Sequence, residues 1–315
     1  MDAVIRWSAL LALGLAAGPS AVAAQRDSIP GTAWTEADWR ILVSKVRWGS
    51  RHGVDTLPLG KAIARLGVTF VGATYRPGTL EVPGPERLVV NLRELDCVTF
   101  IENVLALVRF VREAGPALLA DPPVARARYE SYLRDLRYRD GTVAGYPSRL
   151  HYFSEWLSEA ERWGRVRLVA RELGGVPDDE RIEFMSTHPA AYRQLADSAV
   201  LAAIGAMEGR LNAAGARWYL PEDAIEAAAS GIEDGDLIAA TSTIPGLDIA
   251  HTGLALWRKG RLHLLHAPLV GKNVEISAIP LADRIRRLET QDGIMVARPL
   301  GWGPAGSGRP SAARP

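Results

Sequence analysis

The sequence predicts an α+β fold in which helices come first and an antiparallel sheet comes last. Apolar residues at helical spacing recur through the earlier part of the chain, and short apolar runs joined by tight turns follow from about residue 216. Consecutive short strands with brief connections form antiparallel sheets. With 315 residues, 48% of them hydrophobic and 23% charged, the chain can bury a sizeable core.

The chain divides into three predicted segments. Residues 1–24 carry Arg6, an apolar stretch and the small residues Ala21 to Ala24, which is typical of a secretory signal peptide. We therefore expect export, to the periplasm or the extracellular space; a retained N-terminal anchor is the alternative. Residues 25–303 form the predicted single catalytic domain, and residues 304–315 a disordered tail rich in Gly, Pro, Ser and Ala.

Composition narrows the classes of partner. The net charge of +1 gives no electrostatic reason to expect a nucleic-acid partner. No segment after the predicted signal peptide has about 18 uninterrupted apolar residues, so no transmembrane segment is expected in the mature chain. The sequence has neither a His-Glu-x-x-His motif nor a cysteine cluster, so we expect no metal and no other cofactor. The chain is expected to be a monomer.

The first elements are predicted from apolar spacing and turn residues. Residues 36–48 and 59–66 have helical periodicity, whereas residues 68–72 are β-like and lead into a turn-rich loop. A short buried strand is expected around residues 87–91. A helix then starts after Asp96, a good N-cap residue, and ends before Gly115-Pro116.

Further helices are predicted at residues 122–137, 154–163 and 192–212, with a polar, aromatic loop at 145–153. Strands follow at 217–220, 237–242, 251–257, 261–267, 274–279 and 293–298. Arg258-Lys259-Gly260 is a hairpin-like turn that should pair the third and fourth of these strands.

Cys97 is the only cysteine, and it falls in the first turn of the helix that Asp96 caps. The positive end of the helix macrodipole favours thiolate, whereas the nearby Asp96 carboxylate opposes it. A lone cysteine is otherwise a packing residue or an intermolecular bridge.

A nucleophilic thiol needs a base. His251 begins a strand directly after a turn, where a side chain can face a cleft. The next strand carries His263 and His266, which alternation places on opposite faces, so at most one of them can face His251. The residues therefore suggest Cys97 as nucleophile, His251 as base and His266 as the group that orients the imidazole.

The order of these motifs resembles the NlpC-type cysteine peptidases and amidases of bacterial cell walls. The matching residues are Leu95-Asp96-Cys97, Asp234-Gly235-Asp236, His251-Thr252-Gly253 and His266-Ala267. Further segments resemble one subfamily, the N-acetylmuramoyl-L-alanine amidase-like proteins. These are Gly78 to Glu81, Val90 to Arg93, Cys97 to Val104, Tyr146 to Phe153, Phe184 to Ser186 and His188-Pro189.

The resemblance implies a papain-like core, in which the nucleophile helix packs on the antiparallel sheet, with additional N-terminal and inserted helices. It also implies a catalytic set of Cys97, His251, His266 and Tyr75, the last near the oxyanion region. Pro77 stands where a Gly is expected, a departure from the family pattern. Tyr146, Ser148 and Arg149 fall in the segment that lines the substrate groove in relatives, and an arginine there suits a substrate carboxylate.

The implied activity is hydrolysis of the amide between N-acetylmuramic acid and L-alanine in soluble muropeptides. A D-glutamyl–diamino acid endopeptidase, a non-catalytic muropeptide-binding module and an acyltransferase on the same fold are the alternatives.

Overall fold

The computed structural model describes residues 32–269 and 272–302. The predicted signal peptide, residues 1–24, and the predicted tail, residues 304–315, lie outside the described residues. The helices of the described part are α2 Glu36–Arg51, α3 Leu59–Val68, α4 Cys97–Glu113, α5 Pro122–Arg137, α6 Phe153–Arg162, α7 Phe184–Thr187, α8 Ser198–Ala213, α9 Ile225–Ala228 and α10 Leu281–Arg286. No helix among the described residues is both long enough and apolar enough to cross a bilayer.

An eight-stranded antiparallel sheet occupies the C-terminal half of the described chain, in the order β11-β10-β9-β8-β12-β7-β6, with β5 also paired to β12. Its strands are β5 Val166–Leu168, β6 Val176–Asp178, β7 Arg217–Pro221, β8 Leu237–Ser242, β9 Ile249–Arg258, β10 Arg261–His266, β11 Glu275–Ile276 and β12 Gln291–Pro299. Two small parallel pairs accompany it: β1 Thr32–Ala33 with β3 Leu88–Val89, and β2 Thr74–Tyr75 with β4 Glu94–Leu95.

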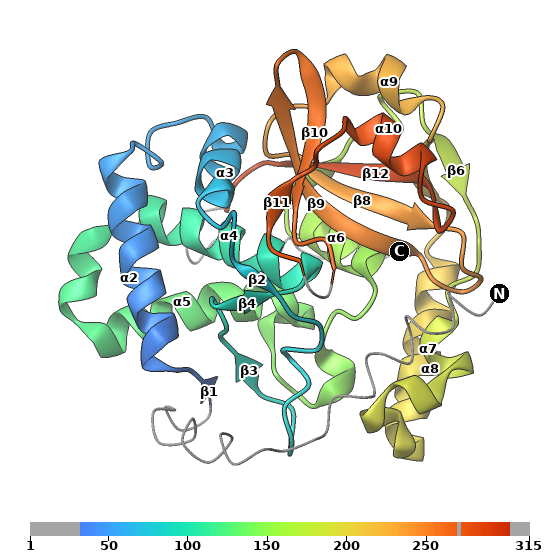
Figure 1. Ribbon diagram of the computed structural model, residues 1–315. Coiled ribbons are helices and arrows are strands. Elements are labelled where there is room, and N and C mark those ends of the chain that lie inside the picture. The colour runs from blue at the N-terminus through green and yellow to red at the C-terminus, as the bar shows by residue number, and fades with distance from the viewer. Residues whose placement is uncertain (1–31, 270–271, 303–315) are drawn as a thin grey trace.

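The sheet separates two hydrophobic cores. In β8, Leu237 and Ala239 belong to the larger core, whereas Ile238 and Ala240 belong to the smaller one, as alternation along a strand requires. Helices α2 to α5 gather on one side, and α9 and α10 lie on the other (Figure 1). The larger core therefore holds α4 against the sheet, and the smaller one holds α10.

A third cluster joins α7 and α8 to the loop before α6. Tyr146 and Tyr152 of that loop pack with Phe184, Met185 and other apolar side chains of this cluster. The Asp248 carboxylate accepts a hydrogen bond from the Ser154 backbone N–H at 2.8 Å. This bond ties the start of α6 to the turn that precedes β9, so the loop and the strand carrying His251 are held together.

The predicted α+β class is confirmed by this mixture of helices and antiparallel sheet. The helices expected at 36–48, 59–66, 97–113 and 122–137 are present, the first two ending slightly later than predicted. Six strands were expected after residue 216: the one at 237–242 is found with the expected bounds, four others have slightly shifted ends, and the sixth is much shorter than expected.

Three expectations were wrong. Residues 68–72 end α3 and form turns, because the Thr69 and Phe70 N–H groups bond back to Leu66 and Gly67 carbonyls. The helix expected from residue 192 begins only at Ser198, where Asp197 caps it through its carboxylate. The strand expected at 274–279 is only two residues long.

Candidate active site

A capping box fixes the helix turn that carries Cys97. The Asp96 carboxylate accepts from the Thr99 N–H at 2.8 Å, and the Thr99 hydroxyl accepts from the Asp96 N–H at 2.9 Å. Asp96 is therefore the N-cap and Cys97 the first residue of α4, as the sequence predicted. This leaves the thiol at the end of a well-anchored helix, where it keeps partial access to solvent.

The surroundings of Cys97 hold its thiol in the protonated form at neutral pH. Burial and the negative charge of Asp96 raise the pKa of Cys97 to about 11, and the proximity of Thr252 offsets this only in part. The helix macrodipole alone would have favoured thiolate. The outcome reverses that expectation because desolvation and the adjacent carboxylate both penalise the charged form.

His251 and His266 lie side by side on neighbouring strands. His251 Nε2 is 2.7 Å from His266 Nδ1, and the two rings meet edge to face with centroids 4.9 Å apart. His263 points elsewhere, with its Nδ1 2.9 Å from the Ser277 carbonyl oxygen. The structure thus pairs His251 with His266 rather than with His263. The alternation of side chains along the strand had left this choice open.

The hairpin between β9 and β10 sets this pairing. Lys259 and Gly260 both have positive φ, as a tight two-residue hairpin turn requires, and the resulting register pairs Leu265 with Leu254. Gly253 lies beside this point, and a Cβ there would sit 2.7 Å from the Leu264 side chain and 2.9 Å from the Leu265 carbonyl oxygen. A glycine therefore lets the two strands approach closely at the histidine end.

Both imidazoles are neutral at physiological pH. Burial, followed by the positive charge of Arg284, lowers the pKa of His266 to about 3. The pKa of His251 is also lowered, by burial, by His266 and by Arg284. A neutral imidazole can accept a proton, and with Nε2 occupied by His266, Nδ1 is the nitrogen of His251 left for an incoming proton.

The thiol lies against the strand that carries His251. The side chain and backbone of Thr252, the residue after His251, both act on the pKa of Cys97. Cys97 in turn raises the pKa of Arg284, whose charge acts on both histidines. The charge of one guanidinium therefore acts on the thiol site and on both imidazoles.

Sequence reasoning missed Arg284. It lies on α10, and its guanidinium donates to the Gln291 side-chain oxygen at 3.1 Å. The segment 281–286 carried no strong helix signal, so nothing placed this arginine near the histidines. Only the packing of α10 on the sheet brings it there.

Tyr75 is close to the thiol. Its strand pairs in parallel with β4, which places Tyr75 opposite Leu95, two residues before Cys97. Burial and the charges of Cys97 and Asp96 raise the pKa of the Tyr75 hydroxyl, so the hydroxyl keeps its proton at neutral pH. A protonated phenol can donate a hydrogen bond toward the site.

The three residues expected to contact substrate lie in the loop before α6. Ser148 closes a local turn, accepting from the Ala144 N–H and donating to the Gly145 carbonyl. Tyr146 is largely buried, with the Arg149 guanidinium over its ring at a centroid distance of 4.9 Å.

Arg149 is only 5% exposed and is engaged by two carboxylates. Its guanidinium donates to Glu81 at 2.7 Å and to both oxygens of Glu86, at 2.8 and 3.1 Å. In this arrangement Arg149 holds its loop in place, and direct contact with substrate stays a prediction.

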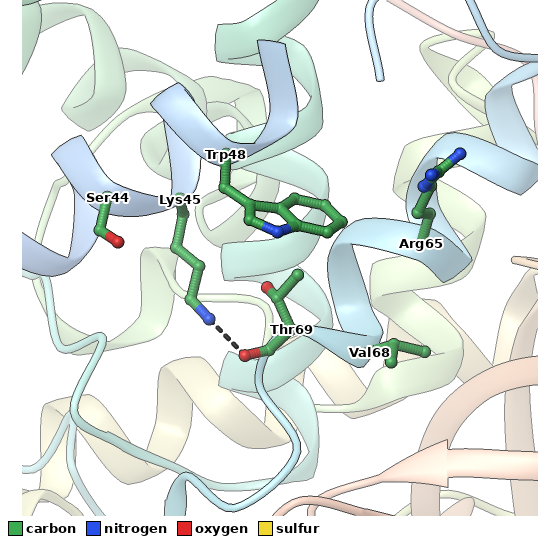
Figure 2. Close-up of a pocket in the computed structure, with 6 residues that line it drawn as sticks. All are labelled: Ser44, Lys45, Trp48, Arg65, Val68 and Thr69. Carbon is green, nitrogen blue, oxygen red and sulfur yellow. Dashed lines mark hydrogen bonds between the residues drawn. The ribbon is translucent and has the colours of Figure 1, made fainter. Parts of the chain in front are cut away.

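A pocket of about 580 Å³ lies between α2 and α3, apart from these residues. Lys45 and Trp48 from α2 and Arg65 from α3 line it, and the Lys45 ammonium donates to the Thr69 carbonyl (Figure 2). Burial lowers the pKa of Lys45 to about 8. None of the lining residues belongs to the Cys97 site.

Within residues 32–269 and 272–302, no group of three or more His, Cys, Asp or Glu side chains is placed to hold a metal ion. The side chains described at the site are a thiol, two neutral imidazoles and a phenol.

The family comparison matches residues 65–294 to the AmiA-like model, described as N-acetylmuramoyl-L-alanine amidase-like. This range holds Cys97, both histidines and Tyr75. The chain belongs to the N-acetylmuramoyl-L-alanine amidase-like family. Membership indicates an amidase-like hydrolase whose substrate class is peptidoglycan.

The chain is also similar to several solved structures, one of which has the name of this family. An N-acetylmuramoyl-L-alanine amidase from Bacteroides uniformis is 35% identical, with a TM-score of 0.69, over 76% of this chain and 98% of the other. A Bacteroides fragilis protein described as a candidate xylanase is also 35% identical, with a TM-score of 0.65, over 74% of this chain and 98% of the other. A Legionella pneumophila protein at 18% identity, with a TM-score of 0.59, covers 84% of this chain and 96% of its own and shares the fold alone. No functionally curated protein matches the chain.

Proposed function

We propose that this amidase-like protein hydrolyses the amide between N-acetylmuramic acid and L-alanine of muropeptides, with Cys97 as nucleophile. The observation that carries the proposal is the packing of the lone thiol, at the start of α4, against the strand that presents the His251–His266 pair. The name of the Bacteroides uniformis relative supports the choice of bond.

The proposed fold is the papain-like, NlpC-type core. Helix α4 supplies the nucleophile, and the adjacent strands β9 and β10 supply the histidines. The remaining helices, α2 and α3 before it and α5 to α8 after it, are additions to that core.

In the first half-reaction, His251 Nδ1 takes the Cys97 thiol proton as the sulfur attacks the lactyl carbonyl carbon. The carbon–sulfur bond forms, and the Cys97 backbone N–H and the Tyr75 hydroxyl hold the oxyanion. Collapse breaks the carbon–nitrogen bond, and His251 returns its proton to the leaving L-alanine nitrogen. The product is a thioester on Cys97 and a free stem peptide.

In the second half-reaction, a water gives a proton to His251 and attacks the thioester carbonyl. The carbon–sulfur bond breaks, and the thiolate recovers its proton from His251. The muramic acid carboxyl is released, and the resting thiol and imidazole are restored. Because both groups are neutral at rest, His251 acts as a general base in each attack.

We further propose that the protein is an exported monomer that acts on soluble muropeptides in the periplasm or outside the cell. Tyr146, Ser148 and Arg149 remain the proposed contacts for substrate, and Arg149 also supports their loop. A non-catalytic muropeptide-binding module is the second candidate, because the raised pKa of Cys97 leaves the resting thiol uncharged.

The test is mass spectrometry of products from a defined disaccharide tripeptide muropeptide. The wild type should release the free tripeptide, and Cys97→Ala and His251→Gln should each lose at least about 10³-fold in rate while keeping the wild-type melting temperature. His52→Gln, which alters an exposed histidine stacked on Trp48, is the matched control and should keep full turnover. Turnover by folded Cys97→Ala would rule out Cys97 as the nucleophile. If the wild type bound the muropeptide but released no products, the non-catalytic binding module would be favoured.

A further inference from the structure

One atom of the histidine pair has no hydrogen-bond partner. His266 is only 1% exposed, and its Nε2 is a buried polar atom that bonds to nothing among the described residues. An unpaired buried donor is costly, and such atoms mark places where a partner arrives or moves. The nearest acidic oxygen is Glu275 Oε1, at 3.8 Å.

The tautomers of the two histidines are linked. If His251 is to accept a proton at Nδ1, its own proton must lie on Nε2, where it can only be donated to His266 Nδ1, 2.7 Å away. His266 must then carry its proton on Nε2. That N–H is the donor without a partner, so an acceptor at this position would select the tautomer that makes His251 a base.

Glu275 is held where it can serve as that acceptor. In the β10–β11 pair it lies directly opposite His266. The backbone just before it is pinned to the Tyr75 loop, because the Val274 N–H donates to the Ala73 carbonyl at 2.8 Å and the Tyr75 N–H to the Lys272 carbonyl at 3.0 Å. The Glu275 side chain itself is 48% exposed. A shift of about 1 Å brings its carboxylate into hydrogen-bond range of His266 Nε2.

We propose that Glu275 is a positioning residue for the reaction: it accepts the His266 Nε2–H and thereby holds His251 in the tautomer that can take the Cys97 proton. This inference rests on the proposed function. It adds a partly exposed carboxylate to the proposed catalytic set of one thiol and two imidazoles.

The titratable groups around His266 come from three elements. His251 faces it from β9, Glu275 from β11, and Arg284 from α10. Arg284 disfavours a positive imidazole, whereas the Glu275 carboxylate favours one. The carboxylate therefore also offsets Arg284 when His251 becomes transiently protonated.

The test compares Glu275→Leu, which removes the acceptor, with Glu275→Gln, which keeps an acceptor oxygen without the charge. Glu275→Leu should lower kcat by about 10- to 100-fold with KM within about twofold, and Glu275→Gln should retain most of the activity. Glu226→Gln is the matched control, since Glu226 is 51% exposed and pairs with Arg261 on the surface.

Nitrogen-15 NMR of the histidine side chains gives a readout that does not depend on activity. The His266 signals, assigned by their loss in His266→Asn, should report a single Nε2–H tautomer in the wild type and a mixture in Glu275→Leu. An unchanged tautomer together with wild-type kcat in Glu275→Leu would overturn the proposal, as would a change in KM alone. If the tautomer responds while no variant, nor the wild type, hydrolyses muropeptides, the positioning role stands and the proposed function fails.

Discussion

At the scale of single residues, burial and neighbouring charges set the resting state of the thiol and of the two imidazoles. The Asp96 carboxylate caps α4, and its negative charge adds to burial in raising the pKa of Cys97. Burial is the main cause of the lowered pKa values of His251 and His266, and the charge of Arg284 lowers both further, so the two histidines stay neutral. Together these influences favour an uncharged thiol and an uncharged imidazole over a thiolate and an imidazolium. In the proposed mechanism the proton therefore moves only as the thiol attacks.

This state predicts the pH dependence of alkylation. Below the Cys97 pKa of about 11, the thiolate fraction of the free enzyme rises about tenfold per pH unit. The rate of modification by iodoacetamide should therefore rise about tenfold per unit between pH 7 and pH 9. Because Cys97 is the only cysteine, the mass of the intact protein reports this single site. A rate that is already flat across this range would indicate a preformed thiolate and contradict the neutral pair.

The residues of the site differ in how far local sequence could place them. Asp96 and Cys97 were placed correctly because a cap and the first helical residue are local features. His266 could not be separated from His263 until the Lys259–Gly260 turn set the register. Glu275 reaches the histidines only through strand pairing, which no local pattern in the sequence encodes.

At the scale of elements, a buried ion pair fixes α4 among its neighbours. The Arg137 guanidinium on α5 donates to the Glu102 carboxylate on α4 at 2.8 Å and to the Val89 carbonyl of β3 at 2.6 Å. Both side chains are 2% exposed. This ion pair and hydrogen bond therefore join α4, α5 and β3 at one point.

Breaking that pair should destabilise the fold strongly. Glu102→Ala leaves the Arg137 charge buried and unpaired, so the free energy of unfolding should fall by about 3–5 kcal/mol. The double variant Glu102→Leu/Arg137→Met removes both charges and should recover much of this loss. Urea denaturation measures both changes.

The exposed Arg167–Glu172 pair provides the control, with side chains 45% and 54% exposed. Glu172→Ala should cost at most about 1 kcal/mol because water screens such pairs. A cost for Glu102→Ala no larger than that of Glu172→Ala would show that the buried pair does not anchor α4.

Helix prediction succeeded where end signals were local. Asp121 with Pro122 starts α5, and Gly115-Pro116 follows α4. It failed at residues 192–197, where apolar spacing continues although Asp197 caps a helix that starts at Ser198. Helix α10 was missed because its six residues are stabilised by packing on the sheet rather than by intrinsic propensity.

At the scale of the whole molecule, the sheet brings together groups that are far apart in the sequence. Cys97 comes from the helices on one side and Arg284 from α10 on the other, while the histidines come from the strands between them. The turn before β9 is tied to α6 through Asp248, so the loop proposed to contact substrate is positioned by the strand that carries His251. In the proposed mechanism, substrate binding and proton transfer thus depend on the same strand.

The central claim is that Cys97 carries the muramoyl lactyl group as a thioester, and acid-quenched intact-protein mass spectrometry during turnover tests it most directly. The account predicts a transient adduct whose mass equals the sugar–lactyl acyl group, absent in Cys97→Ala, together with free stem peptide. An adduct that also contains L-alanine and D-glutamate would identify the endopeptidase instead. The same adduct on Cys97→Ala would contradict the claim that this thiol is the nucleophile.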